Sequence, residues 1–332
     1  GSRGLGDVYK RQEYTFDEMI NYKEGDRGFK VKAEDTYGYI TISTLPVTYK
    51  TIPGPSLTLT ESTIFAGTDA KKGVSMQIES VRGVHEVVIY RIENGSEVEA
   101  LRETRSGEHT LNYAPEIDFT EATSKLKVVV SDGREGKEAT GYVKAYVNMD
   151  VATLNVGSQP LANNAHEKYP DAFGMVSLND LKTYSVDYAI ANEANAKNID
   201  FKFYCFGAAG SPRLYSMDNT GKDGEFSGST GKLSAIKVKN LTRFAILSNF
   251  DYENATVTSI SSEILSSSIT QSLLDPIAVG NIIAFRTGGS SAAGGGRIGV
   301  MKVINITEPK DLVSSNATAR VMTVEIKFPQ KK

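Results

Sequence analysis

Four tyrosines and an arginine lie close together in the middle of the chain and could form a sugar-binding surface: Tyr184, Tyr188, Tyr204, Arg213 and Tyr215. Such surfaces stack sugars on flat aromatic rings beside hydrogen-bonding groups, and a ring with a polar tip suits this task. The chain has 16 tyrosines and no tryptophan, so tyrosine would have to supply the rings. For most of these rings we favour packing in a core or a strand, and a sugar platform is the alternative. We name the five as candidate ligand-binding residues.

Asp218, Asp223 and Glu225 lie in a short loop with glycines and have the chemistry of a calcium loop. Ca²⁺ binds carboxylate oxygens, and glycine lets the chain turn around the ion. The spacing is not that of an EF-hand. We therefore favour a solvated turn, with these three residues as the only candidate metal ligands, and expect no metal.

Two glycine-rich segments resemble nucleotide-binding loops but lack the required context. Gly294 to Gly299 fits G-x-G-x-x-G, a pattern that needs a helix after it, because the pyrophosphate binds free helix amides. The residues that follow alternate like a strand, so we predict a hairpin tip. Gly228 to Lys232 ends like a phosphate-binding loop, but Leu233 replaces the hydroxyl that would bind Mg²⁺. We expect no nucleotide and no cofactor.

No catalytic group can be assembled from the remaining reactive residues. The three histidines, His85, His109 and His166, are scattered and form no Ser-His-Asp pattern. Cys205 lies between aromatic residues, so we predict a thiol buried in a strand. Because it is the single cysteine, the chain cannot form an internal disulfide. We therefore expect a protein that is not an enzyme.

Composition places the chain among globular proteins of more than one domain. It has 332 residues, of which 40% are hydrophobic and 23% charged, with a net charge of -3. This length predicts two or three domains. The charge gives no basic surface for nucleic acid or anionic membrane. No apolar run approaches the roughly 20 residues that a membrane helix needs.

An internal repeat indicates sandwich domains. The segments Phe29 to Asp35 and Leu45 to Tyr49 recur as Leu126 to Asp132 and Val143 to Val147, about 97 residues later, which is the length of an immunoglobulin-like β-sandwich. We expect the C-terminal part of a truncated sandwich at 13–52 and a complete sandwich at 53–148. The expected strands of the complete sandwich are 56–61, 74–80, 85–93, 98–103, 109–117, 125–131 and 139–148, with a hairpin turn at Asn94-Gly95.

Residues 149–332 are richer in Gly, Ser and Asn, and their apolar runs are spaced less regularly. We predict a larger, β-rich ligand-binding domain there. One helix is expected at Tyr184 to Ala196, with Ser185 as its N-cap, and a second at Ser259 to Ser267. The expected strands are 199–206, 232–238, 244–247, 282–286, 298–306 and 321–328. The predicted fold class is all-β with minor α: immunoglobulin-like repeats followed by a larger antiparallel β domain.

The first residues differ in origin from the rest. Ser2 to Gln12 is similar to one reading frame of a transposon adapter used for sequencing libraries, which indicates an assembled metagenomic read and sets 1–12 aside as non-native. We therefore expect the natural chain to continue upstream, where a signal peptide or lipidated cysteine would lie.

The chain resembles the surface lipoproteins of Bacteroidetes, which carry tandem immunoglobulin-like modules and an outer β domain. The likeness is carried by the repeated segments, by Ile199 to Tyr204 ahead of Ser211-Pro212, and by the blocks Ile277 to Thr287, Gly299 to Val303 and Val321 to Phe328. It implies an extracellular, lipid-anchored protein of the bacterial outer surface that captures a glycan, with the sandwiches as spacers. An adhesion or structural module that binds a host or bacterial surface protein is the alternative, and a carbohydrate-active enzyme the third.

Overall fold

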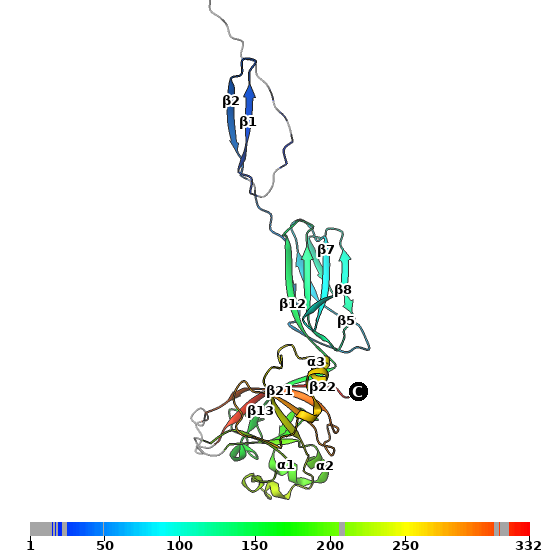
Figure 1. Ribbon diagram of the computed structural model, residues 1–332, viewed down its shortest axis with the longest axis vertical. Coiled ribbons are helices and arrows are strands. Elements are labelled where there is room, and N and C mark those ends of the chain that lie inside the picture. The colour runs from blue at the N-terminus through cyan, green and yellow to red at the C-terminus, as the bar shows by residue number, and fades with distance from the viewer. Residues whose placement is uncertain are drawn as a thin grey trace, which may run out of the picture. The chain divides into compact units, whose positions relative to one another are not determined.

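The computed structural model describes residues 15, 17, 19–21, 25–48, 50–205, 210–308, 312 and 319–332. The segment 1–12 and Phe206, the last residue of an expected strand, lie outside them. The described chain is mostly β-strand in several sheets, with three short α-helices, which confirms the prediction of an all-β fold with minor α. It divides into two compact units, 1–53 and 54–332 (Figure 1).

The first unit contains one antiparallel hairpin, formed by β1 (Gly28–Glu34) and β2 (Ile40–Pro46). Asp35 closes its turn, since the amides of Tyr37 and Tyr39 each donate to the Asp35 carboxylate at 2.9 Å. Most side chains of the two strands are exposed. The hairpin therefore buries little apolar surface, and a two-stranded hairpin of this kind is marginally stable by itself.

The second unit begins with a β-sandwich. One sheet has the order β3-β6-β9 and the other β4-β12-β11-β7-β8, with a small β5-β10 pair beside them. Met76 and Ile78 of the first sheet pack with Val128 and Val143 of the second in one core. The strands are β3 (Ser56–Leu59), β4 (Thr63–Ala66), β5 (Lys72–Gly73), β6 (Met76–Glu79), β7 (Glu86–Glu93), β8 (Ser96–Thr104), β9 (Thr110–Tyr113), β10 (Glu116–Ile117), β11 (Thr123–Ser131) and β12 (Glu138–Val147).

Two sandwich predictions differ from the structure. The expected strand 109–117 is divided into β9 and β10, with Pro115, which has no amide hydrogen for a sheet, between them. Strands β4 and β5 were not predicted; β4 pairs with β12 in parallel, and β5 pairs with β10. The turn at Asn94-Gly95 is confirmed, because both residues have positive φ, 50° and 80°, as a two-residue hairpin turn requires.

The repeated segments form hairpins of the same register. Phe29 pairs with Leu45 in the β1-β2 hairpin, and their counterparts Leu126 and Val143 pair in β11-β12. The turns also correspond, since the amide of Asp35 donates to a carbonyl across its turn, as does that of Asp132. Leu126 and Val143 are buried in the sandwich core.

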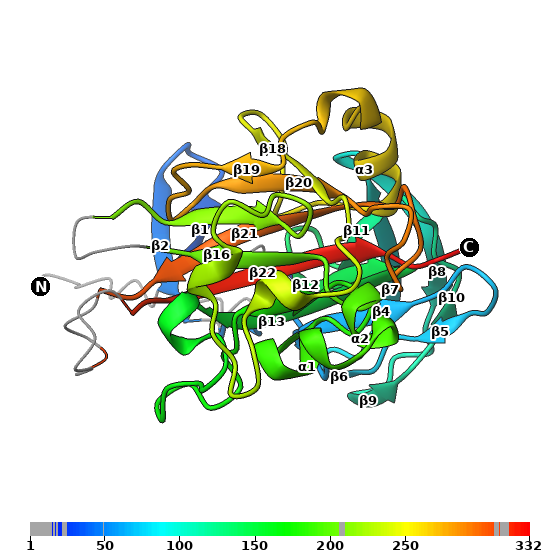
Figure 2. The same cartoon turned by 90° about the horizontal axis from the view of Figure 1, so that it is seen from below.

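The rest of the second unit is built on two five-stranded sheets, β13-β22-β21-β20-β18 and β15-β14-β16-β17-β19. Figure 2 shows β13, β22, β21 and β20 side by side. Strand β22 alternates, so that Met322, Val324 and Ile326 enter the core shared by the two sheets. The strands are β13 (Met149–Gly157), β14 (Met175–Ser177), β15 (Lys182–Tyr184), β16 (Phe201–Tyr204), β17 (Arg213–Ser216), β18 (Arg243–Leu247), β19 (Leu273–Leu274), β20 (Ile282–Arg286), β21 (Ile298–Ile306) and β22 (Val321–Pro329).

The predicted helix Tyr184 to Ala196 is in fact two helices, α1 (Val186–Ala191) and α2 (Glu193–Lys197). Asn192 separates them, because its backbone is extended and its side chain accepts the amide of Asn195 as an N-cap. Ser185 caps α1, as predicted. The second predicted helix begins earlier, as α3 (Val257–Glu263), where Thr256 and Ser259 form a capping box.

Strand prediction in this part was uneven. The ranges predicted for β20 and β21 match the structure, and the loop between them contains Gly294 to Gly296, as expected for a hairpin tip. The predicted strand 232–238 was wrong, because Leu233–Ala235 is a 3-10 turn. None of the described helices is long and apolar enough to cross a membrane.

Candidate functional site

Two of the candidate tyrosines are buried. Tyr204 and Tyr215 are 1% and 4% exposed, and their rings meet edge to face with centroids 5.8 Å apart. The Tyr204 hydroxyl donates to Glu225 at 2.6 Å, and the Arg213 guanidinium lies 5.7 Å from the centroid of the Tyr204 ring. These residues pack within the domain and offer no open ring face.

Tyr184 and Tyr188 are half-buried and stack on each other. Their centroids are 3.9 Å apart, and the ring planes differ by 15°. The Tyr184 hydroxyl donates to Asp180, and the Tyr188 hydroxyl accepts a hydrogen bond from Asn198. The structure therefore places the four tyrosines in two packed pairs, and each ring of this second pair covers one face of the other.

The acidic-loop carboxylates each have a different partner within the protein. Asp218 binds Arg243 at 2.8 Å, and Asp223 binds the buried Lys202 at 2.7 Å. Glu225 binds Lys222 at 3.0 Å and accepts the Tyr204 hydroxyl. Among the residues that the structure describes, no three acidic, histidine or cysteine side chains are grouped to hold a metal ion.

The loop at Gly228 to Lys232 binds a carboxylate of the protein itself. The amides of Ser229 and Thr230 donate to Asp187 Oδ1 at 2.8 and 3.3 Å. Hydrogen bonds, the strongest from the Ser229 and Asn163 side chains, lower the pKa of Asp187 to about 2. The loop that resembled the end of a phosphate-binding loop is thus bound through its backbone amides to Asp187, at the start of α1.

A cavity of about 800 Å³ lies where β4 and β12 of the sandwich meet β13 and the turn between β14 and β15. We call it the junction cavity. Its lining includes the ring of Phe65, which is 51% exposed and packs against Tyr146 with centroids 5.3 Å apart. It is lined by Phe65, Ala66, Gly67, Thr68, Asp69, Tyr146, Asn148, Met149, Asp150, Val151, Asn179, Asp180, Leu181 and Gln330.

The polar residues that line the junction cavity, which we call its polar wall, are rich in acidic side chains. The polar wall carries three carboxylates and three side-chain amides, Asp69, Asp150, Asp180, Asn148, Asn179 and Gln330. Burial raises the pKa of Asp180, but hydrogen bonds from Tyr184 and Asn198 outweigh burial and hold this pKa below its ordinary value. Sequence reasoning missed this site because β4 was not predicted, so nothing placed Phe65 beside Tyr146.

A second, smaller groove runs between the sandwich and the loop before α3. Two adjoining hollows of about 290 and 280 Å³ share Gly95, Ser124, Asp251 and Asn254, and Tyr142, 57% exposed, lies at one end. We call it the Tyr142 groove.

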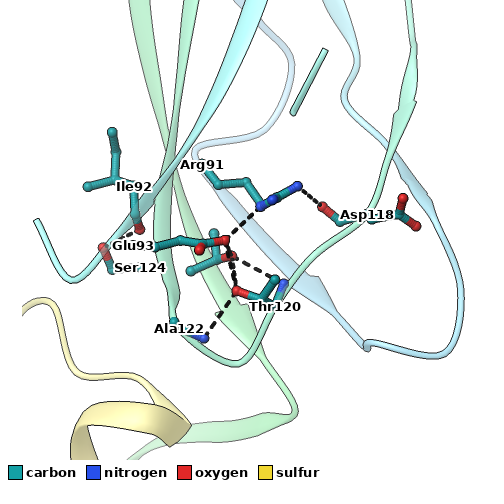
Figure 3. Close-up of polar contacts among 8 residues, drawn as sticks. Arg91, Ile92, Glu93, Asp118, Thr120, Ala122 and Ser124 are labelled. Carbon is teal, nitrogen blue, oxygen red and sulfur yellow. Dashed lines mark hydrogen bonds and ion pairs between the residues drawn. The ribbon is translucent and has the colours of Figure 1, made fainter. Parts of the chain in front are cut away.

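A hydrogen-bonded cluster around Glu93 stabilises the nearby end of the sandwich (Figure 3). Arg91 and Thr120 donate to the Glu93 carboxylate at 2.7 and 2.8 Å. Burial raises the pKa of Glu93, but these hydrogen bonds outweigh burial and lower it overall. The cluster joins the end of β7 to the loop before β11. Gly95 follows β7 and Ser124 lies at the start of β11, and both line the Tyr142 groove.

No protein-family model matches the chain, and no curated protein matches its sequence.

Proposed function

We propose that this chain is a non-enzymatic binding module of a bacterial outer surface, and that it captures a glycan in the junction cavity. The observation that carries the proposal is the exposed ring of Phe65 beside a wall of carboxylates and amides in one concave site. Sugars have apolar faces and hydroxyl edges, so a site for them combines an aromatic ring with convergent polar groups. This site replaces the tyrosines between 184 and 215 as our leading candidate.

Asp180 is poorly suited to act as the general acid of a glycosidase. A glycosidase needs a carboxylic acid whose pKa is raised, so that it can protonate the leaving oxygen. Asp180, on the cavity wall, has its pKa shifted in the opposite direction. A carbohydrate-active enzyme is thus the less favoured alternative, and it would release new reducing ends from a bound oligosaccharide.

The sandwiches serve as spacers in this proposal. The matching registers of β1-β2 and β11-β12 support tandem immunoglobulin-like modules, the second complete and the first represented by its last strands. A lipid anchor upstream and an extracellular location follow from the resemblance to Bacteroidetes surface lipoproteins, and they belong to the proposal.

A glycan array followed by calorimetry on the best neutral oligosaccharide tests the proposal. Phe65→Ala should weaken binding up to about tenfold, since one stacking ring contributes roughly 0.5 to 1.5 kcal/mol. Tyr142→Ala removes another exposed sandwich aromatic, from the Tyr142 groove, and should leave the affinity unchanged. A uniformly blank array would refute glycan capture, and a loss confined to Tyr142→Ala would refute the location.

An adhesion module is the second candidate, favoured by the outer edge of β18. On this edge, which faces away from β20, the backbone of Phe244 pairs with that of Gln271. Backbone groups two residues apart in a strand point to the same side, so the amide and carbonyl of Ile246 also point outward from this edge. Ile246 and Leu265 are 48% and 67% exposed near a hollow of about 270 Å³. A strand of a surface protein could add here. If so, Ile246→Lys would abolish capture of that protein and leave glycan binding intact.

A further inference from the structure

Asn148 and Asn179 of the junction cavity use both of their side-chain amide hydrogens inside the protein, and Gln330 uses one. Asn148 donates both amide hydrogens, to Thr68 at 3.1 Å and Glu121 at 3.0 Å. Asn179 likewise donates to Asp180 at 3.1 Å and Asn198 at 3.2 Å. Gln330 donates to Asp150 at 3.0 Å. The polar wall is therefore left mainly with oxygen atoms, which accept hydrogen bonds.

The remaining acceptors carry a high negative charge. Within the described residues, the Asp69 carboxylate accepts no hydrogen bond from the protein, and Asp150 Oδ2 is also free. With Asp180, three carboxylates line the cavity, and none of the lining residues in the described part of the chain is a lysine or arginine. The wall thus matches a ligand rich in donors and carrying positive charge.

Lysines close to the cavity are bound elsewhere. Lys144 and Lys327 lie 5.3 and 5.4 Å from the centroid of the Tyr146 ring. Lys144 is 3.9 Å from Glu253, while Lys327 is buried and donates to the carbonyl of Tyr252 at 2.6 Å. Asp180 interacts electrostatically with Lys182, and Asp150 with Arg297, so among the described residues Asp69 is the cavity carboxylate without a cation partner.

A metal ion fits these carboxylates poorly. Asp69, Asp150 and Asp180 come from three separate segments, and in the described chain they do not form a group that could hold one ion. A ligand that meets them one by one along its length fits the arrangement better. An oligosaccharide with an amine on successive rings is such a ligand.

Building on glycan capture at this site, we propose that the junction cavity selects oligosaccharides of 2-amino sugars with protonated amines. The amine donates three hydrogen bonds and pairs with a carboxylate, while the ring stacks on Phe65. Uronic acids and sulfated sugars present acceptors and negative charge to an acceptor-lined, acidic wall. They are excluded by like-charge repulsion.

Calorimetry in mildly acidic buffer with three probes of equal length tests the selection: glucosamine, N-acetylglucosamine and galacturonic acid oligomers. Glucosamine oligomers should bind at least tenfold more tightly than the acetylated ones, and the galacturonic acid oligomers should not bind. The preference should shrink as salt is added, because its source is electrostatic.

A matched pair of variants separates the cavity from the overall negative charge of the protein. Asp69→Asn should reduce the preference for glucosamine at least threefold, whereas Asp118→Asn, an exposed carboxylate of the same sandwich outside the cavity, should leave it unchanged. If glucosamine and N-acetylglucosamine oligomers bind equally, or if the two variants behave alike, the selection for protonated amines is refuted while glycan capture stands. If no oligosaccharide of any kind binds, glycan capture itself is refuted.

Discussion

The ring of Phe65 packs against that of Tyr146 at a tilt of 32°, across the parallel pairing of β4 with β12. Phe65 is half-exposed and Tyr146 is buried. The pair therefore fixes the orientation of an aromatic surface at the edge of the junction cavity. A ring held in this way loses little conformational freedom when a ligand stacks on it.

The buried pair of Lys202 and Asp223 predicts a large stability effect. Their side chains are 0% and 3% exposed, and Lys202 also donates to the carbonyl of Asn219 at 2.9 Å. Burial lowers the pKa of Lys202 despite the nearby Asp223. Asp223→Asn should lower the free energy of unfolding by about 3 to 5 kcal/mol, because it leaves a buried ammonium without its counter-ion.

Urea denaturation measures this change, with Glu193→Gln as the control. Glu193 pairs with Lys197 on the surface of α2, where solvent screens the charges, so its loss should change stability little. Equal urea midpoints for the two variants would show that the buried Lys202–Asp223 pair contributes no more to stability than the exposed Glu193–Lys197 pair, which would contradict the prediction.

The buried Asp200 predicts a pH dependence. Burial raises its pKa from 3.8 to about 6, although Ser291 and the amide of Leu178 donate to its carboxylate. The folded state therefore holds a proton that the unfolded state releases. The contribution of Asp200 to stability is greatest below about pH 4 and is lost as the pH rises through 6, a change of roughly 3 kcal/mol.

Asp200→Asn keeps an acceptor for the Leu178 amide and cannot ionise. Its free energy of unfolding relative to wild type should rise between pH 4 and 6. Denaturation across this window tests the assignment. A constant difference between Asp200→Asn and wild type would contradict it.

Gly299 predicts an effect of close packing. A methyl group there would meet the rings of Phe285 and Phe328, at 2.3 and 2.7 Å, inside the shared core. Gly299→Ala should destabilise the domain by about 1 to 3 kcal/mol in thermal or urea unfolding. Gly224→Ala is the control, because a methyl group there meets nothing within 4 Å. If Gly299→Ala destabilised the protein as little as Gly224→Ala does, the packing argument would be contradicted.

Local patterns predicted much of this fold. Alternation located β20 and β21, and Asn94-Gly95 located a hairpin, because each signal lies within a few neighbouring residues. The parallel partner of β12 was missed, since β4 is only four residues long and its pairing depends on contacts distant in sequence. The break at Asn192 was missed because apolar spacing continues across it.

The candidate site was harder to predict than the fold. All four residues of β16 are buried, because its sheet is covered by a core on each face. Tyr204 lies in the uninterrupted apolar run from Phe203 to Phe206, which is typical of such a strand and was the available signal that this ring would be buried. The junction cavity depends on segments far apart in sequence, so no local pattern could predict it.

Amide hydrogen exchange with and without the best-binding oligosaccharide tests the central claim most directly, because it locates the ligand on the protein. We predict slower exchange in two segments that line the junction cavity, from Phe65 to Asp69 and from Asn179 to Leu181, and unchanged exchange around Tyr142. Protection confined to residues 184–215 or to the Tyr142 groove, with none at Phe65 to Asp69, would contradict the account.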